Sequence, residues 1–441
     1  MSRFTGPLLA PLGRRAVGRT LLGGAAAVAL GTGGVALALE RGRRTAGDPE
    51  GVGPVTLATG KDTTGYLQDV LDDWNADHPG QHATLVQLSA AADEVHAQLV
   101  QELQGDEGRF DVMNLDVVWT AEFADRGWVA QLSPDDFDLD TFLPSVPAVG
   151  RTEGRLYAVP YVTNAAMLYY RSDVLAAAGE LPPRTWAELE RLASTVAPAH
   201  GLDGYAGQFW PYEGLTVNAL EAVRSAGGDL LADRYNVVAN SPGTRAGLEF
   251  LVRGLRRGWI PQATLGYQEE ESREAFQSGR LLFLRNWPYV YREANAPGSP
   301  VAGRFGVVPL PGPHGPGRHV LGGSCLAVAA ASRNQRTARA LIRYLTSRRI
   351  QRRVLTEGGL PPVRADLYQD PQLVTQYPFL PVLRRAVTAA GSRPSIPQYQ
   401  QLSLVFSEAV YEMLRGRRDV AQGVARLAMD LRELLGTSPN A

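Results

Sequence analysis

Residues 155–171 read R-L-Y-A-V-P-Y-V-T-N-A-A-M-L-Y-Y-R, a run of apolar, β-branched and aromatic side chains. The run predicts two buried strands, residues 157–160 and 161–170, because such side chains favour the interior of a sheet. Only Thr163 and Asn164 interrupt the second of them. A buried amide needs hydrogen-bond partners, which come either from neighbouring backbone or from a ligand. The stretch therefore predicts a buried core and leaves both roles for Asn164 open.

Upstream of this stretch, strands and helices alternate. The predicted strands span residues 54–58, 84–88 and 110–115, and the helices lie around residues 66–74 and 93–103, the second capped by Asp93. This β-α-β-α-β order is typical of an open parallel sheet, which binds ligands beyond the carboxyl ends of its strands. The loop 59–63 and Asp116 follow the first and third strands, so both occupy such ends.

Downstream, the sequence predicts a second set of helices and strands. Thr185, with Glu188 three residues later, forms the capping-box pattern at the start of a helix over residues 185–196. Residues 205–214, Y-A-G-Q-F-W-P-Y-E-G, gather four aromatic side chains beside Glu213. A strand over residues 280–284 leads into the segment R-N-W-P-Y. Aromatic, acidic and amide side chains thus recur in loops that follow strands.

Residues 1–44 have the composition of a targeting segment. Arg14, Arg15 and Arg19 precede an apolar run over residues 21–39, which contains an A-L-A cleavage pattern. The arginine pair suggests a twin-arginine export signal, and a retained membrane anchor is the alternative. In both cases the rest of the chain is expected outside the cytoplasm. The single cysteine, Cys325, lies far from this segment, so no cysteine is available for an N-terminal lipid anchor or an intrachain disulfide.

Size and composition restrict the function classes. The chain has 441 residues, and the part after the targeting segment is too long for one hydrophobic core, which predicts two lobes. A formal net charge of −1 argues against nucleic-acid binding. The six histidines lack the spacing of metal ligands, and no phosphate-binding or nucleotide-binding glycine motif occurs. We therefore expect neither a metal nor a cofactor.

The aromatic and acidic side chains together suit a sugar. Its C–H faces lie on aromatic rings, while each hydroxyl both donates and accepts hydrogen bonds. A secreted glycoside hydrolase that uses Asp116 and Glu213 is the alternative, because such enzymes also place two carboxylates around a sugar.

Several motifs in order resemble the extracellular sugar-binding proteins of ABC importers, family 1, of the maltose-binding type. The chain is most similar to the trehalose/maltose-binding members, and the resemblance covers nearly everything after residue 54. The motifs that carry it are A-V-P-Y-V-T-N-A-A-M-L-Y-Y-R, P-R-T-W-A-E-L at 183–189, R-N-W-P-Y-V, V-L-G-G-S-C-L-A-V, and R-P-S-I-P-Q-Y at 393–399.

The resemblance implies a set of sugar-binding residues. Trp287 would be the main stacking ring, with ordinary core packing as its alternative, and Arg393 would reach in from the C-terminal part unless it pairs with a surface acid. The acidic residue that the family often has near the first loop has no certain match at Lys61 and Asp62. The implied substrate-binding residues are Asp62, Asp116, Asn164, Tyr212, Glu213, Trp287, Gly322, Gly323 and Arg393.

The resemblance also implies a fold and partners. The fold would be the α/β, two-lobed periplasmic-binding-protein-like fold of type II, with a ligand cleft between lobes joined by three crossovers, near residues 162–164, 321–324 and 357–359. Lobe one would comprise residues 54–162 and 322–357, and lobe two residues 163–321 and 358–436. The chain would be a monomer without catalytic activity. It would bind a disaccharide or oligosaccharide of the trehalose/maltose class by cleft closure and deliver it to the membrane subunits of an ABC permease.

Overall fold

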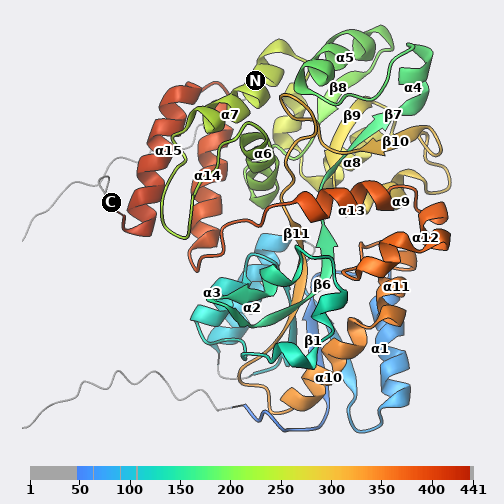
Figure 1. Cartoon of the computed structure of the whole chain (residues 1–441), viewed down its shortest axis with the longest axis vertical. Helices are drawn as coiled ribbons and strands as arrows, with labels where there is room; N and C mark the ends of the chain where they lie inside the picture. Colours follow the sequence, from blue (N-terminus) through green and yellow to red (C-terminus); the bar gives the residue numbers. More distant parts are fainter. Residues whose placement is uncertain (1–46, 63, 90, 106–107, 438–441) are drawn as a thin grey trace, which may run out of the picture. The chain divides into compact units, whose positions relative to one another are not determined.

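The computed structural model describes residues 47–62, 64–89, 91–105 and 108–437. Two β-sheets, each flanked by helices, organise this part of the chain (Figure 1). The predicted export segment, residues 1–44, lies outside the described residues. Within the described ranges, no helix is long and apolar enough to cross a membrane.

The first sheet has the strand order β2-β1-β3-β11-β6. Its first three strands are parallel, and β11 lies antiparallel between β3 and β6. The predicted β-α-β-α-β order is therefore confirmed. The elements are β1 (Val55–Thr59), α1 (Tyr66–Asp77), β2 (Ala83–Gln87), α2 (Ala92–Gln104), β3 (Val112–Asp116), α3 (Thr120–Asp125), β6 (Ala158–Asn164) and β11 (Gly322–Val328).

The second sheet has the order β10-β7-β9-β8, with β7 antiparallel to both of its neighbours and β8 parallel to β9. Thr185 and Glu188 form the predicted capping box at the start of α5. The elements are β7 (Met167–Arg171), α4 (Ser172–Ala177), α5 (Trp186–Ala199), β8 (Asp203–Ala206), α6 (Glu213–Ser225), α7 (Pro242–Arg257), α8 (Glu269–Gln277), β9 (Leu281–Asn286), α9 (Val290–Ala294) and β10 (Phe305–Val308).

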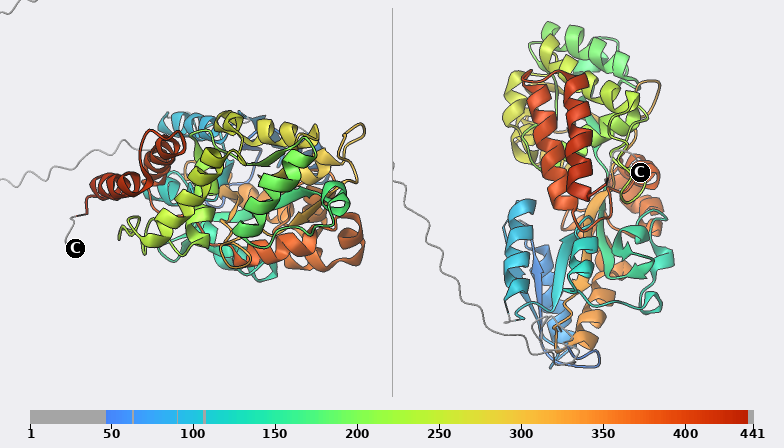
Figure 2. Two further views of the ribbon diagram at one scale, coloured as in Figure 1. Left: turned by 90° about the horizontal axis from the view of Figure 1, so that it is seen from above. Right: turned by 90° about the vertical axis from the view of Figure 1, so that its left-hand side faces the viewer.

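The C-terminal part is helical. We call each large sheet together with the helices and loops around it a region, the first region for the first sheet and the second for the second sheet. In Figure 2, α14 and α15 lie side by side, and they pack on α6 and α7 of the second region. Residues 361–364 instead bond to the first region, where Pro361 accepts from the backbone of Thr163 and Val363 from that of Leu143. The helices are α10 (Gln335–Leu345), α11 (Arg348–Thr356), α12 (Pro371–Gln376), α13 (Leu380–Ala389), α14 (Tyr399–Leu414) and α15 (Val420–Leu435).

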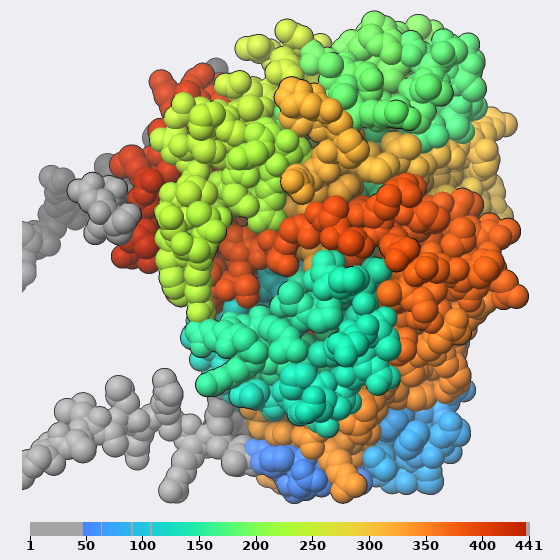
Figure 3. All heavy atoms as spheres, viewed as in Figure 1, coloured from blue at the N-terminus to red at the C-terminus, as the bar shows by residue number. Residues whose placement is uncertain are grey.

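A small hairpin, β4 (Arg151–Thr152) with β5 (Arg155–Leu156), contacts the segment that carries Arg234. Its turn holds Glu153 at φ 51°, the one positive-φ residue other than glycine in the described part of the chain. The Glu153 carboxylate accepts a hydrogen bond from Arg234 at 2.6 Å. Figure 3 shows the yellow-green segment that carries Arg234 against the teal segment of the hairpin.

The prediction of one strand over residues 161–170 is wrong. Two strands of different sheets occupy this region, β6 up to Asn164 and β7 from Met167, and Ala165–Ala166 joins them. Both strands are almost wholly buried, so their sequence has no alternation that could mark where one sheet ends and the other begins.

The predicted cap of α2 is also wrong. The helix begins at Ala92, and its N-cap residue, Ala91, makes no side-chain hydrogen bond. Asp93 lies inside the first turn, where a negative charge complements the partial positive charge of the helix N-terminus. Its carboxylate accepts from Gln400 at 3.0 Å.

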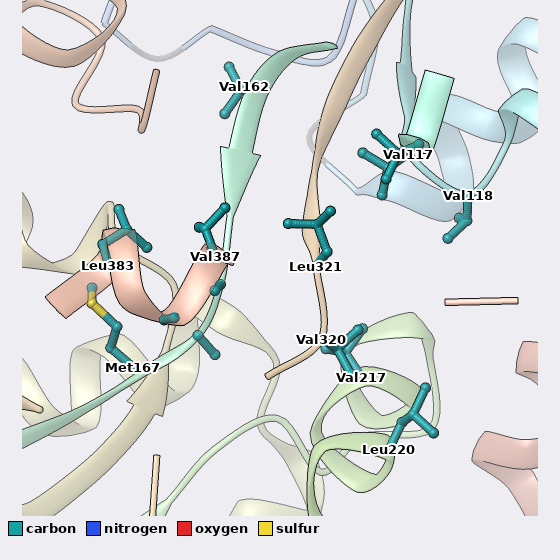
Figure 4. Close-up of a cluster of buried hydrophobic side chains, with 14 of the residues drawn as sticks. Val117, Val118, Val162, Met167, Val217, Leu220, Val320, Leu321, Leu383 and Val387 are labelled. Atoms are coloured by element: carbon teal, nitrogen blue, oxygen red, sulfur yellow. The ribbon is translucent and has the colours of Figure 1, made fainter. Parts of the chain in front are cut away.

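Hydrogen bonds connect the segments that pass from one sheet to the other. His319 contacts the carbonyl of Ala166 through Nδ1 at 3.0 Å, Leu321 donates to the carbonyl of Gly391, and Gly391 donates to that of His319. Burial lowers the pKa of His319 to about 4, so the ring is neutral at pH 7 and Nδ1 is the donor. Figure 4 shows buried apolar side chains around these segments: Val162, Met167, Val320 and Leu321, with Val217 and Leu220 of α6.

Gly323 is required for the close pairing of β11 and β6. Its φ is 118°, and a Cβ at this position would lie 2.1 Å from the carbonyl oxygen of Val162. Gly323→Ala should therefore lower the free energy of unfolding by about 2 kcal/mol or more, measured by urea denaturation. Gly266→Ala is the control, since Gly266 has no positive φ and open space around it. Equal stability of the two variants would contradict the requirement for glycine at position 323.

Candidate functional site

Three predicted site residues lie at one edge of the first sheet. Asp116 is the last residue of β3, and Asn164 is the last residue of β6. Because β11 is antiparallel to both strands, its first residues lie beside their ends, with Ser324 opposite Asp116 and Gly322 opposite Asn164. The structure thus brings Asp116, Asn164 and Gly322 together.

Arg393, between α13 and α14, joins this edge to the second region. Its side chain is only 2% exposed and donates to Asp116 Oδ1 at 2.9 Å and to Glu213 Oε1. Glu213 is the first residue of α6. The alternative that Arg393 pairs with a surface acid is wrong, because Glu213 is 13% exposed and Asp116 24% exposed.

Glu213 uses both carboxylate oxygens within the protein. Besides Arg393, its Oε1 accepts from the hydroxyl of Tyr399 at 2.6 Å, and its Oε2 accepts from the hydroxyl of Ser403. Burial raises the pKa of Glu213, and the guanidinium of Arg393 opposes this shift. The geometry therefore gives Glu213 a structural role, which is to hold Arg393 in place.

Trp287 lies directly after β9, and its ring is half-buried. The indole N–H donates to Glu269 Oε1 at 3.3 Å, while the hydroxyl of Tyr212 donates to the other oxygen of the same carboxylate. Ring atoms Cη2 and Cζ3 lie 3.2 Å from where a Cβ on Gly322 would stand. The ring therefore leaves little room for a side chain at Gly322.

Two predicted residues have local structural roles. Asp62 accepts hydrogen bonds from Thr64 and from the backbone of Leu67, all at 2.8–3.0 Å, and so orders the loop before α1. No hydrogen bond links it to the other predicted site residues in the described ranges. Gly323 allows the approach of β11 to β6, as described above.

Sequence reasoning missed three side chains that hold the site: Glu269, Tyr399 and Ser403. Glu269 begins the acidic run E-E-E, which has the composition of a solvated helix start. Tyr399 is the last residue of the motif R-P-S-I-P-Q-Y, and an aromatic residue in that motif is a signal that could have identified it. Ser403 carries no distinguishing pattern.

Arg393→Met tests the buried ion cluster. The substitution leaves two carboxylates without their shared cation, so the free energy of unfolding should fall by about 3–5 kcal/mol in a urea titration. Arg426→Met removes the exposed pair with Asp430 on α15 and should cost less than about 0.5 kcal/mol. A loss no larger than that of the control would show that the cluster is weakly coupled to folding.

Comparison with known proteins identifies the family of the chain. A family model described as bacterial extracellular solute-binding protein matches residues 60–352. A probable ABC transporter-binding protein of Deinococcus radiodurans is 35% identical over 375 residues, 82% of this chain and 89% of its own length. A mannitol-binding protein of Pseudomonas aeruginosa is 25% identical over 366 residues, 74% of this chain and 81% of its own. Maltose-bound T. maritima MalE3 has a TM-score of 0.81 at 33% identity, covering 86% of this chain and 99% of that one.

The fold and these relatives define a class, the two-lobed solute-binding proteins of ABC importers. The chain belongs to the family of bacterial extracellular solute-binding proteins. Members of this class bind a substrate for transport and do not transform it. The alternative of a glycoside hydrolase with Asp116 and Glu213 is therefore rejected.

Proposed function

We propose that the chain binds a disaccharide or a short oligosaccharide of the trehalose/maltose class outside the cytoplasm and delivers it to the membrane subunits of an ABC permease. The single observation that carries this proposal is a set of unpaired buried polar atoms on β3, on β6 and on Arg393, which bonds to the last residue of β3. Asn164 Oδ1, Arg393 Nε and Asn114 Oδ1 are buried and have no hydrogen-bond partner among the described residues.

These atoms suit the hydroxyls of a sugar. Buried polar groups are normally paired, so unpaired acceptors and a donor in one region favour a ligand that supplies both functions. Asp116 adds an acceptor, since only its Oδ1 is bonded within the described chain. The half-buried Trp287 ring adds a flat apolar face for the C–H groups of a pyranose.

The relatives support polyhydroxylated ligands of two kinds. MalE3 is described with maltose bound, and the Pseudomonas relative is described as mannitol-binding. An open-chain hexitol has no ring face to stack, so the indole of Trp287 favours the cyclic sugars, and mannitol is the second candidate.

Trp287→Ala tests the proposal. Calorimetric titration of the parent with trehalose, maltose, maltotriose and mannitol should show binding of a cyclic sugar. The substitution should weaken the tightest of these by about tenfold or more, because a stacking ring at a cleft contributes much of the contact. Trp210→Ala removes a tryptophan that is 43% exposed and should leave the affinity unchanged. Binding of mannitol alone, or unaltered affinity of the Trp287 variant, would count against the proposal.

We further propose that the lobes close on the ligand. The chain passes between the proposed lobes three times, and the first two crossings are at residues 162–164 and 321–324. The sequence predicts the third crossing at 357–359, but we propose that it lies near Gly391. Residues 361–364 bond to the first region, and Gly391 is hydrogen-bonded to both His319 and Leu321. Hinge motion concentrates its backbone change in a few such residues.

Small-angle scattering tests closure. A sugar that contacts both lobes stabilises the closed form, so the radius of gyration should be smaller in the loaded protein than in the empty one. An identical radius, with binding confirmed by calorimetry, would reject closure while leaving sugar binding intact.

A further inference from the structure

Arg285 is a fully buried charge behind the proposed sugar site. It lies on β9, two residues before Trp287, and has 0% exposure. A buried guanidinium is costly unless its environment pairs it. The structure pairs it with Glu221 of α6, which accepts from Nε at 2.8 Å, and with the side-chain oxygen of Gln208, which accepts from Nη1.

The rest of the guanidinium faces an aromatic ring. Its Nη2 has no hydrogen-bond partner among the described residues. Its central carbon stands over the ring of Trp287, 4.6 Å from the ring centroid. A cation over an indole face is attracted by the negative charge of the π-system, and the attraction increases where water is excluded.

Three contacts therefore restrain the Trp287 ring. Arg285 covers one face, Glu269 accepts the indole N–H, and the position of a Cβ on Gly322 lies 3.2 Å from two atoms of the ring edge. Glu221 and Gln208 hold Arg285 in turn, and both are buried. A ring that is fixed before the ligand arrives loses less conformational entropy on binding.

We infer that Arg285 is a positioning residue, which fixes the Trp287 ring in the orientation that accepts a sugar and contacts no ligand itself. The consequence for affinity rests on the proposed function. The consequence for the ring does not, since it concerns the sugar-free protein.

The test is fluorine NMR of protein labelled with 5-fluorotryptophan, with the Trp287 resonance assigned by Trp287→Phe. Arg285→Met combined with Glu221→Gln removes the cation without leaving its acid charged. In the sugar-free protein this pair of substitutions should shift or broaden the Trp287 resonance. If maltose binds the parent, its affinity should fall by about tenfold.

The matched control is Arg253→Met with Glu190→Gln, which removes another ion pair whose arginine stands over an aromatic ring, that of Phe250. The Trp287 resonance should be unchanged there. An unchanged resonance in the Arg285 variant, or an equal shift in the control, would overturn the inference. A parent protein that does not bind maltose, together with a shifted Trp287 resonance in the Arg285 variant, would count against maltose as the ligand and leave the inference about the ring intact.

Arg285→Lys keeps the charge beside Glu221 and decides the matter if the double variant does not fold. An ammonium group lacks the flat face of a guanidinium, so the Trp287 resonance should shift again. An unchanged resonance in Arg285→Lys would overturn the inference.

Discussion

The guanidinium of Arg393 must be paired because it is removed from water, and its two acids come from the regions of the two different sheets. Asp116 ends a strand of the first sheet, and Glu213 begins a helix of the second region. Breaking a buried ion pair leaves an uncompensated charge, so this cluster links three parts of the chain that lie far apart in the sequence. Tyr399 and Ser403 then fix Glu213.

Helix α6 is the element on which this arrangement depends most. It provides Glu213 for Arg393 and, two turns further on, Glu221 for Arg285. Almost the whole helix is buried, so neither acid can turn away to water. One helix thus supplies an acid to each of these two buried arginines, Arg393, which reaches the first sheet, and Arg285, which lies against the Trp287 ring.

Local signals predicted much of the fold. The alternation of strands and helices before Asp116 and the capping box at Thr185 depend on neighbours in sequence, and both are confirmed. The break at Ala165–Ala166 could not be predicted, because two buried strands look alike whichever sheet they join. The partners of Arg393 could not be predicted either, since they lie 277 and 180 residues away. Candidate residues could thus be named from motifs, while their contacts required the tertiary structure.

The position of β11 has a consequence for the order in which the protein folds during synthesis. This strand lies between β3 and β6, yet all four strands of the second sheet precede it in the chain. Until residues 322–328 leave the ribosome, β3 and β6 each expose an unpaired edge, and such edges are prone to pair with other chains. The first sheet therefore begins first and is completed last, so a nascent chain shorter than about three-quarters of its length requires protection from aggregation.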